Sequence, residues 1–301
     1  MKKGEIVDSL IKRKIVFWGT GLLAKNIYID AKVNDQDFDI EFFIDNNIGK
    51  ENEMLYGKQI LGPHVIEELD FQEYLIVICS SFYKEITEQL KIFQLKEGRH
   101  FVNVTVFKDV LSYRMVRRKL KGKNEKIKII IGANDTYQSN WISTNQSFLD
   151  LLKEEDWRAL FSFNSISNIV AEHVWEHLDY IDGVNAAIRC KKFMEIGGKL
   201  RVAVPDKNHP NRYYNELCKT NGVGNIYGDQ HKIFYDYKLI QKMLSEAGFR
   251  DIKLLEYFDE SGEFHTLPWD CEDGFIKRSK NDPRNWDGQL RYTSLIVDAI
   301  K

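Results

Sequence analysis

Residues 14–32 read KIVFWGTGLLAKNIYIDAK. The stretch opens with the apolar, β-rich run KIVFW, which predicts a buried strand. The pattern Gly19-x-Gly21-x-x-Ala24 follows, and the residues after it have the composition of a helix. The glycines permit a tight turn that aims backbone N–H groups at a phosphate, and a small third residue lets the helix pack closely on the strand. The stretch therefore predicts the first strand, turn and helix of a parallel α/β sheet.

The same alternation continues through the first third of the chain. Further strands are predicted at IEFFIDNN (residues 40–47) and EYLIVICSS (residues 73–81), and a helix at FYKEITEQLKIFQ (residues 82–94). Asp45 ends the second strand, where a dinucleotide fold places the acid that binds a ribose. Gly19, Gly21 and Asp45 are therefore candidate nucleotide-binding residues. The alternative is that the two glycines only shape a strand-to-helix turn.

A second series of strands and helices follows a basic segment at residues 110–126. Its strands are predicted at IKIIIGAN (127–134), NWIST (140–144), SISNIVA (165–171), KLRVAVPD (199–206) and TSLIVDAIK (293–301), and its helices near residues 147–160, 172–194 and 236–249. Strands that alternate with helices pair in parallel through right-handed crossovers. The sequence therefore predicts an α/β fold of two Rossmann-like, doubly wound domains with mainly parallel sheets, at residues 1–120 and 125–301.

The composition narrows the function. The chain carries 43 Lys and Arg against 45 Asp and Glu, with no long basic stretch, so we expect no nucleic acid partner. No run of about 18 apolar residues indicates membrane insertion. The first residues, MKKGEIVDSLIKRK, lack the apolar core of a signal peptide, so we expect a cytoplasmic protein. The cysteines form no C-x-x-C pair, and we assign no residue to a metal.

Four segments of the first third resemble one kind of module: WGTGLLAK (18–25), FFIDNN (42–47), YGKQILGP (56–63) and LIVICSSFYKEI (75–86). They are similar to the small Rossmann-like module fused to many bacterial glycan-modifying enzymes, including the N-terminal unit of sugar acetyltransferases. In those relatives the module holds a nucleotide or a nucleotide-linked sugar. The resemblance implies such a ligand at Gly19, Gly21 and Asp45.

The second half carries a resemblance of its own, in segments that keep one order: AEHVWEHL (171–178), FMEIGGKLRVAVPD (193–206), GDQHKIFYDY (228–237), EAGFRDIKLLEYFDESGEFH (246–265), RSKNDPRN (278–285) and YTSLIVDAIK (292–301). Together they resemble a group of predicted bacterial class I methyltransferases that depend on S-adenosylmethionine (SAM). The resemblance implies SAM as the cofactor. The fusion to a glycan-type module implies a small-molecule or nucleotide-linked sugar as the acceptor, in surface polysaccharide biosynthesis. A homodimer is left open.

In that family, loops after the first, second and fourth strands hold SAM. The resemblance gives this role to Gly132, Ala133, Asn134, Thr144, Asn145, Glu172 and His173. The first loop, IGANDTYQSNW (131–141), departs from the usual acid followed by G-x-G-x-G, and only Gly132 keeps its place. Thr144 and Asn145 stand where an acid is usual, and their polar groups accept from a ribose without charge assistance.

Methyl transfer needs alignment and a base that takes the proton of the acceptor. His173 and His177 lie four residues apart, so we expect them on one face of the helix predicted from residue 172. We take His177, His231 and Asp206 as candidate catalytic residues and assign Trp175 to packing. Each candidate also has a structural alternative, such as a helix cap for Asp206.

Three other functions are open. The run HVWEH reads H-x-x-E-H, the pattern of inverted-motif zinc peptidases, with His173 and His177 as ligands and Glu176 as base. The altered first loop is also compatible with a domain that has lost SAM and acts as a scaffold for glycan enzymes. The N-terminal glycine motif allows a nicotinamide-dependent oxidoreductase, although no Tyr-x-x-x-Lys signature accompanies it. The strand-helix alternation favours the methyltransferase.

Overall fold

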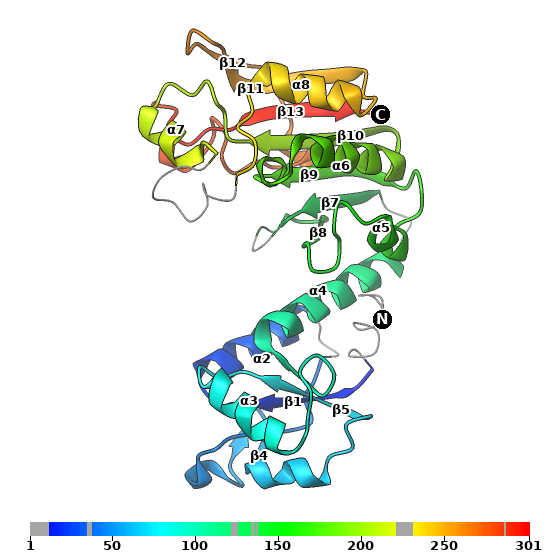
Figure 1. The fold of residues 1–301 in the computed structure, drawn as a ribbon, viewed down its shortest axis with the longest axis vertical. Helices are drawn as coiled ribbons and strands as arrows, with labels where there is room; N and C mark the ends of the chain where they lie inside the picture. The colour runs from blue at the N-terminus through cyan, green and yellow to red at the C-terminus, as the bar shows by residue number, and fades with distance from the viewer. Residues whose placement is uncertain are drawn as a thin grey trace. The chain divides into compact units, whose positions relative to one another are not determined.

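The structure is a computed structural model that describes residues 12–34, 38–121, 126–133, 136, 138–220, 231–285 and 287–301. The chain divides into two compact units, Met1–Arg118 and Lys119–Lys301. Each unit contains its own sheet (Figure 1). Helix α4 (Val104–Lys121) occupies much of the basic segment that the sequence suggests as a boundary.

The first unit is built on a six-stranded sheet with the order β3-β4-β2-β1-β5-β6. Its strands are β1 (Lys14–Trp18), β2 (Phe43–Ile44), β3 (Met54–Leu55), β4 (Lys58–Leu61), β5 (Tyr74–Ile78) and β6 (Phe101–Asn103). Its helices are α2 (Leu22–Asn34), α3 (Tyr83–Ile92) and α4, with 3-10 turns η1 (Ile48–Lys50) and η2 (Pro63–Glu68). Every strand pair among the described residues of this sheet is parallel except β3 with β4.

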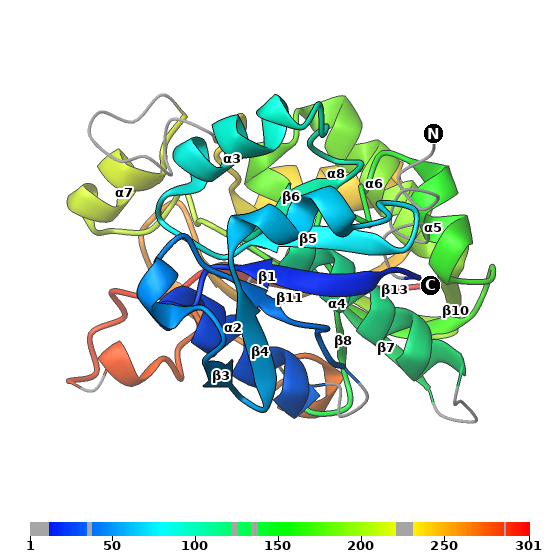
Figure 2. The same cartoon turned by 90° about the horizontal axis from the view of Figure 1, so that it is seen from below.

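Helices cover both faces of the first sheet, in which β1 and β5 lie side by side (Figure 2). Phe17 of β1 belongs to the apolar cluster that contains Ile27 of α2 and Val110 of α4. Its neighbour Val16 belongs to a second cluster, which contains Ile86 of α3. Successive side chains of a strand point to opposite faces, so a strand covered on both faces is apolar throughout. This explains the uninterrupted run KIVFW.

The second unit contains a seven-stranded sheet with the order β12-β11-β13-β10-β9-β7-β8. Its strands are β7 (Ile127–Ile131), β8 (Ile142–Ser143), β9 (Ile166–Glu172), β10 (Met194–Val204), β11 (Asp251–Phe258), β12 (Phe264–Thr266) and β13 (Leu295–Ile300). Its helices are α5 (Glu154–Leu160), α6 (Tyr180–Phe193), α7 (Arg212–Cys218) and α8 (Tyr237–Glu246), with 3-10 turns η3 (Trp175–His177), η5 (Cys271–Asp273) and η6 (Pro283–Asn285). In the described part of the chain, no helix is both long and apolar enough to span a membrane.

The second sheet is parallel on one side and antiparallel on the other. Strands β8, β7, β9 and β10 pair in parallel. Strand β13 runs antiparallel to both of its neighbours, β10 and β11, and β12 runs antiparallel to β11. The Rossmann-like α/β fold class is confirmed, with a mixed rather than wholly parallel second sheet.

Two helices of the second unit begin later than the sequence predicts. The helix expected from residue 172 is absent there, because β9 continues to that residue and His173 takes a left-handed conformation with φ +56°. Helix α6 begins after Asp179, whose side chain accepts a hydrogen bond from Asp182 N as an N-cap. Helix α5 likewise covers only the last part of the segment predicted at residues 147–160.

Each sheet has a point at which the chain reverses its direction of travel across the strands. In the first sheet β1 lies between β2 and β5, and in the second β7 lies between β8 and β9. In open α/β sheets, ligands bind outside the carboxyl ends of the strands at such a point. The topology therefore places one candidate site after β1 and β5, and another after β7 and β9.

Candidate functional site

A cavity of about 750 Å³ lies at the reversal point of the first sheet. Its walls include Gly19 and Gly21 after β1, Asp45 after β2, and Ser80 after β5. The structure thus brings together the three residues that the sequence selects in this unit. Nucleotide binding by these residues stays a prediction.

Gly19 is a lining residue of this cavity whose backbone conformation requires glycine. Its φ is +118°, and a Cβ atom at this position would lie 2.6 Å from the carbonyl oxygen of Cys79. A side chain would therefore meet both backbone strain and a backbone clash. Gly21 differs, because a Cβ there would meet no atom within 4 Å. The requirement for glycine thus belongs to the first position of the motif.

Asp45 carries a paired negative charge in this cavity. It accepts hydrogen bonds from the Thr20 hydroxyl, from Asn47 N at 2.9 Å and from Lys50 Nζ at 3.0 Å. Burial would raise the pKa of Asp45, but the hydrogen bonds from Thr20, Asn47 and Lys50 lower it below its ordinary value. The cavity therefore offers a carboxylate for hydroxyl groups and, beside it, an ammonium group for a phosphate.

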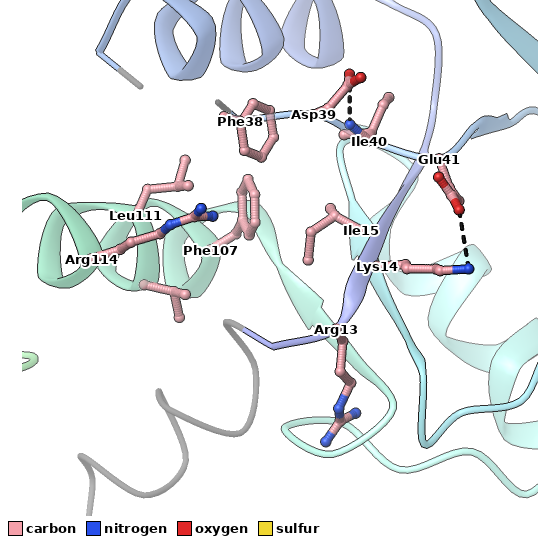
Figure 3. Close-up of a pocket in the computed structure, with 11 residues that line it drawn as sticks. Arg13, Lys14, Ile15, Phe38, Asp39, Ile40, Glu41, Phe107, Leu111 and Arg114 are labelled. Atoms are coloured by element: carbon pink, nitrogen blue, oxygen red, sulfur yellow. Dashed lines mark hydrogen bonds and ion pairs between the residues drawn. The ribbon is translucent and has the colours of Figure 1, made fainter. Parts of the chain in front are cut away.

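A smaller cavity of about 190 Å³ lies at the opposite, amino end of β1 (Figure 3). Its charged groups are engaged within the protein: Lys14 pairs with Glu41 at 3.3 Å, and Asp39 pairs with Lys58 at 2.7 Å. The parallel-sheet rule places ligands at the carboxyl ends instead. We therefore assign no ligand to this cavity.

In the second unit, Gly132 forms the first turn after β7. Its φ is +61°, and a Cβ atom there would lie 2.7 Å from Cγ2 of Val174. The loop after β7 thus touches the segment after β9. Ala133, the next predicted cofactor residue, is buried and its N–H donates to the Thr144 carbonyl at 2.9 Å. Asn134 lies outside the described residues.

The two residues predicted to replace the ribose-binding acid differ in their placement. Thr144 is buried, and its hydroxyl donates to the Ile130 carbonyl at 2.9 Å. This bond attaches the end of β8 to β7, so the Thr144 hydroxyl has a partner within the protein. Asn145 is partly exposed at the same strand end, and its carbonyl accepts from Phe148 N and Leu149 N.

Glu172, also predicted to hold SAM, binds the protein's own backbone. One carboxylate oxygen accepts from Lys277 N at 3.1 Å and the other from Arg278 N at 2.8 Å. These bonds hold the 277–278 loop at the end of β9. The observed role of Glu172 is therefore to position that loop.

His173 stands at the bend that follows β9. Its backbone N–H donates to the Ala203 carbonyl at 2.8 Å, which keeps the bend attached to β10. Its ring lies between two partners, with Nε2 3.0 Å from Ser294 Oγ and Nδ1 3.1 Å from Glu176 Oε1. A left-handed histidine is uncommon and is a pointer to function when it lies at a candidate site.

Three side chains that can bind protons or metals meet beside this bend: Glu176, His177 and His231. One donor atom from each lies within 4.8 Å of the others. The segment after residue 230 is held there because Lys232 N and Ile233 N both donate to the Glu176 carbonyl, at 2.7 and 3.3 Å. The rings of His177 and His231 pack edge to face with centroids 4.9 Å apart. We call this group the Glu-His-His cluster.

Glu176 is the most buried member of the Glu-His-His cluster, with 1% of the residue exposed. Burial would raise its pKa, but the nearby imidazoles of His173 and His177 lower the pKa below its ordinary value. The side chain is therefore a carboxylate at neutral pH. An ionised group in such a place needs a cationic partner.

Asp206, the third predicted catalytic residue, is not a member of this cluster. It is fully buried and accepts from Asn208 N at 3.0 Å and from Phe258 N at 2.7 Å. Burial raises the pKa of Asp206 to about 6. It holds the chain after β10 to the end of β11, which is a structural role. The alternative role of Asp206 as a helix cap is wrong, because α7 is capped by Asn211.

The geometry does not form the helical peptidase motif. His173 and His177 do not share a helical face, because a left-handed residue and the turn η3 occupy this segment. His177 lies with His231 instead. Reasoning from the sequence missed Thr20, which lies between the two candidate glycines, and Lys50, which follows Asp45 by five residues. Glu176 entered it only as the base of the peptidase pattern. Trp175 is fully buried, which confirms its assignment to packing.

Comparisons with known proteins bear on each half of the chain. Residues 11–101 match the family described as C2185-like, N-terminal, and no curated protein matches the sequence. A SAM-dependent methyltransferase from Archaeoglobus fulgidus is similar over 64% of this chain and 94% of its own, with 13% identity and a TM-score of 0.36. One from Thermotoga maritima is similar over 73% of this chain and 98% of its own, with 12% identity and a TM-score of 0.36. Both of these solved structures are SAM-dependent methyltransferases, and their identity and TM-score are too low to carry an argument about this chain.

Proposed function

We propose that the second unit is a SAM-dependent methyltransferase whose cofactor binds outside the carboxyl ends of β7 and β9. The observation that supports this is the contact between the two loops at the reversal point, where Gly132 approaches Val174. Ligands of doubly wound sheets bind where two such loops meet. Two members of the Glu-His-His cluster, Glu176 and His177, follow Val174 closely on the segment after β9, and His231 joins them from the segment before α8.

The side chains present suit removal of a proton from an acceptor. SAM, when bound, supplies an electrophilic methyl group and releases its sulfur as a neutral thioether. His177 and His231 are the candidate bases for the proton of an acceptor hydroxyl or amine. Glu176 stabilises an imidazolium formed on either ring, because it is an ionised carboxylate in a buried position.

For the acceptor we propose a sugar or glycan precursor, presented as a nucleotide-linked sugar and used in surface polysaccharide biosynthesis. Support comes from the cavity of the first unit, which combines a glycine turn, the carboxylate of Asp45 and the ammonium group of Lys50. A nucleotide-linked sugar contains the ribose hydroxyls and phosphates that these groups suit.

The cofactor proposal is tested by calorimetric titration of the full chain with SAM and with S-adenosylhomocysteine. We expect micromolar binding, about −8 kcal/mol, for both compounds. A chain that binds neither compound contradicts the methyltransferase and favours the scaffold alternative.

The acceptor proposal is tested separately, by titration with UDP and UDP-N-acetylglucosamine as probes. Lys50→Ala removes the cation of the cavity and should weaken binding about tenfold, the equivalent of 1.4 kcal/mol. Lys58→Ala is the matched control, because Lys58 pairs with Asp39 beside the smaller cavity. Equal affinities in the two variants, or no binding by the unmodified chain, would remove the first cavity from the proposal.

A further inference from the structure

We propose that Glu176, His177 and His231 form a binding site for one divalent transition-metal ion, with Zn²⁺ as the ion that suits these donors best. Imidazole nitrogens and a carboxylate are the ligands of catalytic zinc sites, which keep a further position open. The inference concerns the Glu-His-His cluster itself and stands whether or not the second unit transfers methyl groups. A bound ion would occupy the imidazole nitrogens, so His177 and His231 act as bases only in the metal-free cluster.

The spacing of the donors is close to that of a metal site. One donor atom from each side chain lies within 4.8 Å of the others, and His231 Nε2 lies 4.0 Å from Glu176 Oε1. A tetrahedral ion with bonds of about 2.1 Å separates neighbouring donors by about 3.4 Å. A side-chain adjustment of about half an ångström therefore brings His231 and Glu176 to coordination distance.

Glu176 provides a second and independent observation. In the part of the chain that the structure describes, neither of its buried carboxylate oxygens receives a hydrogen bond. His173 Nδ1 lies 3.1 Å from Oε1 and can pair with that oxygen, so Oε2 is the oxygen that no described group approaches as a partner. Buried carboxylates are ordinarily hydrogen-bonded, paired or bound to a metal. A cation between Glu176 and the histidines meets that requirement.

The orientation of the His231 ring suits a role as a metal ligand. Its Nδ1 lies 2.7 Å from the Cys218 carbonyl oxygen, which can only accept, so Nδ1 carries a hydrogen. In the neutral ring the lone pair is then on Nε2, the atom nearest Glu176. Metal-binding histidines commonly donate their other nitrogen to a carbonyl in this way. A lone pair that faces a carboxylate is repulsive unless a proton or a cation lies between them.

A second group of potential metal donors differs, because its carboxylate already has hydrogen-bond partners within the protein. Asp259, Glu263 and His265 also come within 4.8 Å of one another. There the Asp259 carboxylate accepts from Ser261 N at 2.8 Å, from Glu263 N at 3.0 Å and, through its other oxygen, from His265 Nε2 at 2.8 Å. This loop needs no cation, and His265 is a suitable control position.

The test uses the full chain, stripped of metal with a chelator and then titrated with Zn²⁺ by calorimetry and with Co²⁺ by visible absorption. We expect one ion per chain and the absorption bands of cobalt bound to nitrogen. His231→Ala and Glu176→Gln should each weaken Zn²⁺ binding at least tenfold, whereas His265→Ala should bind like the unmodified chain. Circular dichroism checks that each variant is folded. If one of them does not fold, His177→Ala is tested in its place.

The alternative is that a proton, rather than a metal, lies between His231 and Glu176. No stoichiometric Zn²⁺ or Co²⁺ binding, or equal affinities for the His231 and His265 variants, would overturn the metal site. SAM titration of the stripped and the loaded chain separates this inference from the proposed function. SAM binding without metal binding defeats the metal site alone, and metal binding without SAM binding defeats the methyltransferase alone.

Discussion

Arg201 on β10 and Asp298 on β13 lie directly opposite each other in the antiparallel register and form a bidentate ion pair inside the second unit. Arg201 Nε lies 2.7 Å from Oδ1 and Nη2 lies 2.9 Å from Oδ2. Both residues are buried, and Arg201 also donates to the carbonyls of Asp270 and Gly274. The pair therefore attaches the 270–274 loop to the sheet.

Removal of one partner should destabilise the second unit strongly. Asp298→Asn leaves the Arg201 guanidinium buried without its counter-charge, and such a loss costs about 3–5 kcal/mol. Urea unfolding, followed by circular dichroism, measures the change in the free energy of unfolding. Lys242→Met breaks the exposed pair with Glu246 and is the control, for which we expect no resolvable change. Equal unfolding curves for the two variants would contradict a structural role for the buried pair.

Gly132→Ala should weaken SAM binding. The new methyl group would meet Val174 in a left-handed turn, and the two loops of the proposed cofactor site would separate. We expect a loss of about tenfold or more in affinity, measured by calorimetry. Gly197→Ala is the matched control, because Gly197 also has a positive φ (+79°) but open space around it. An equal loss in both variants would show that backbone strain, and not the loop contact, is responsible.

Gly19→Ala should destabilise the first unit. The left-handed conformation costs roughly 1–2 kcal/mol for a residue with a Cβ atom, and the clash with the Cys79 carbonyl adds to it. Gly21→Ala should change the free energy of unfolding by less than about 0.5 kcal/mol, because open space surrounds that position. Chemical unfolding of both variants tests the difference, and a reversed order would refute the role given to the first glycine.

Asp206 should make the protein less stable as pH rises from about 4 to about 6. Burial raises its pKa to about 6 in the folded chain, against an ordinary value of 3.8, so the folded state holds a proton that the unfolded state releases. At 1.36 kcal/mol for each pH unit, the loss approaches about 3 kcal/mol and is complete above pH 6. Unfolding curves at several pH values, compared with those of Asp206→Asn, isolate this contribution.

Asp282 is a control for which we expect the opposite dependence of stability on pH. The hydrogen bond from Arg284 lowers the pKa of Asp282, so its contribution is present at neutral pH and is lost as pH falls. Asp282→Asn should therefore change the pH profile in the direction opposite to Asp206→Asn. Profiles that move together would contradict the raised pKa of Asp206.

The fold was largely readable from the sequence, because strands covered on both faces leave continuous apolar runs such as KIVFW and IKIII. The same signal located the two glycine turns, Gly19 and Gly132, at the ends of the first strand of each unit. It failed after β9, where 3.6-residue spacing suggested a helix through His173 and His177. The left-handed backbone at His173 and the N-cap at Asp179 start the helix later.

The composition of the candidate site was harder to predict. The approach of His231 to Glu176 depends on hydrogen bonds from Lys232 N and Ile233 N to the Glu176 carbonyl, between residues far apart in the sequence. Thr144 shows a related difficulty, since a hydroxyl that can accept from a ribose can equally donate to a neighbouring carbonyl, here Ile130. The spacing of residues along the chain does not show which group a side chain will bind in the folded protein.

The place of β13 within the second sheet has a consequence for synthesis on the ribosome. This strand, Leu295–Ile300, lies between β10 and β11, so the sheet keeps a gap at that position until residue 300 has emerged. The sheet of the first unit is complete once β6 has been made. Nascent chains therefore hold a finished first unit while the edges of β10 and β11 still await their partner, and this interval is when the protein is most open to misfolding and to chaperones.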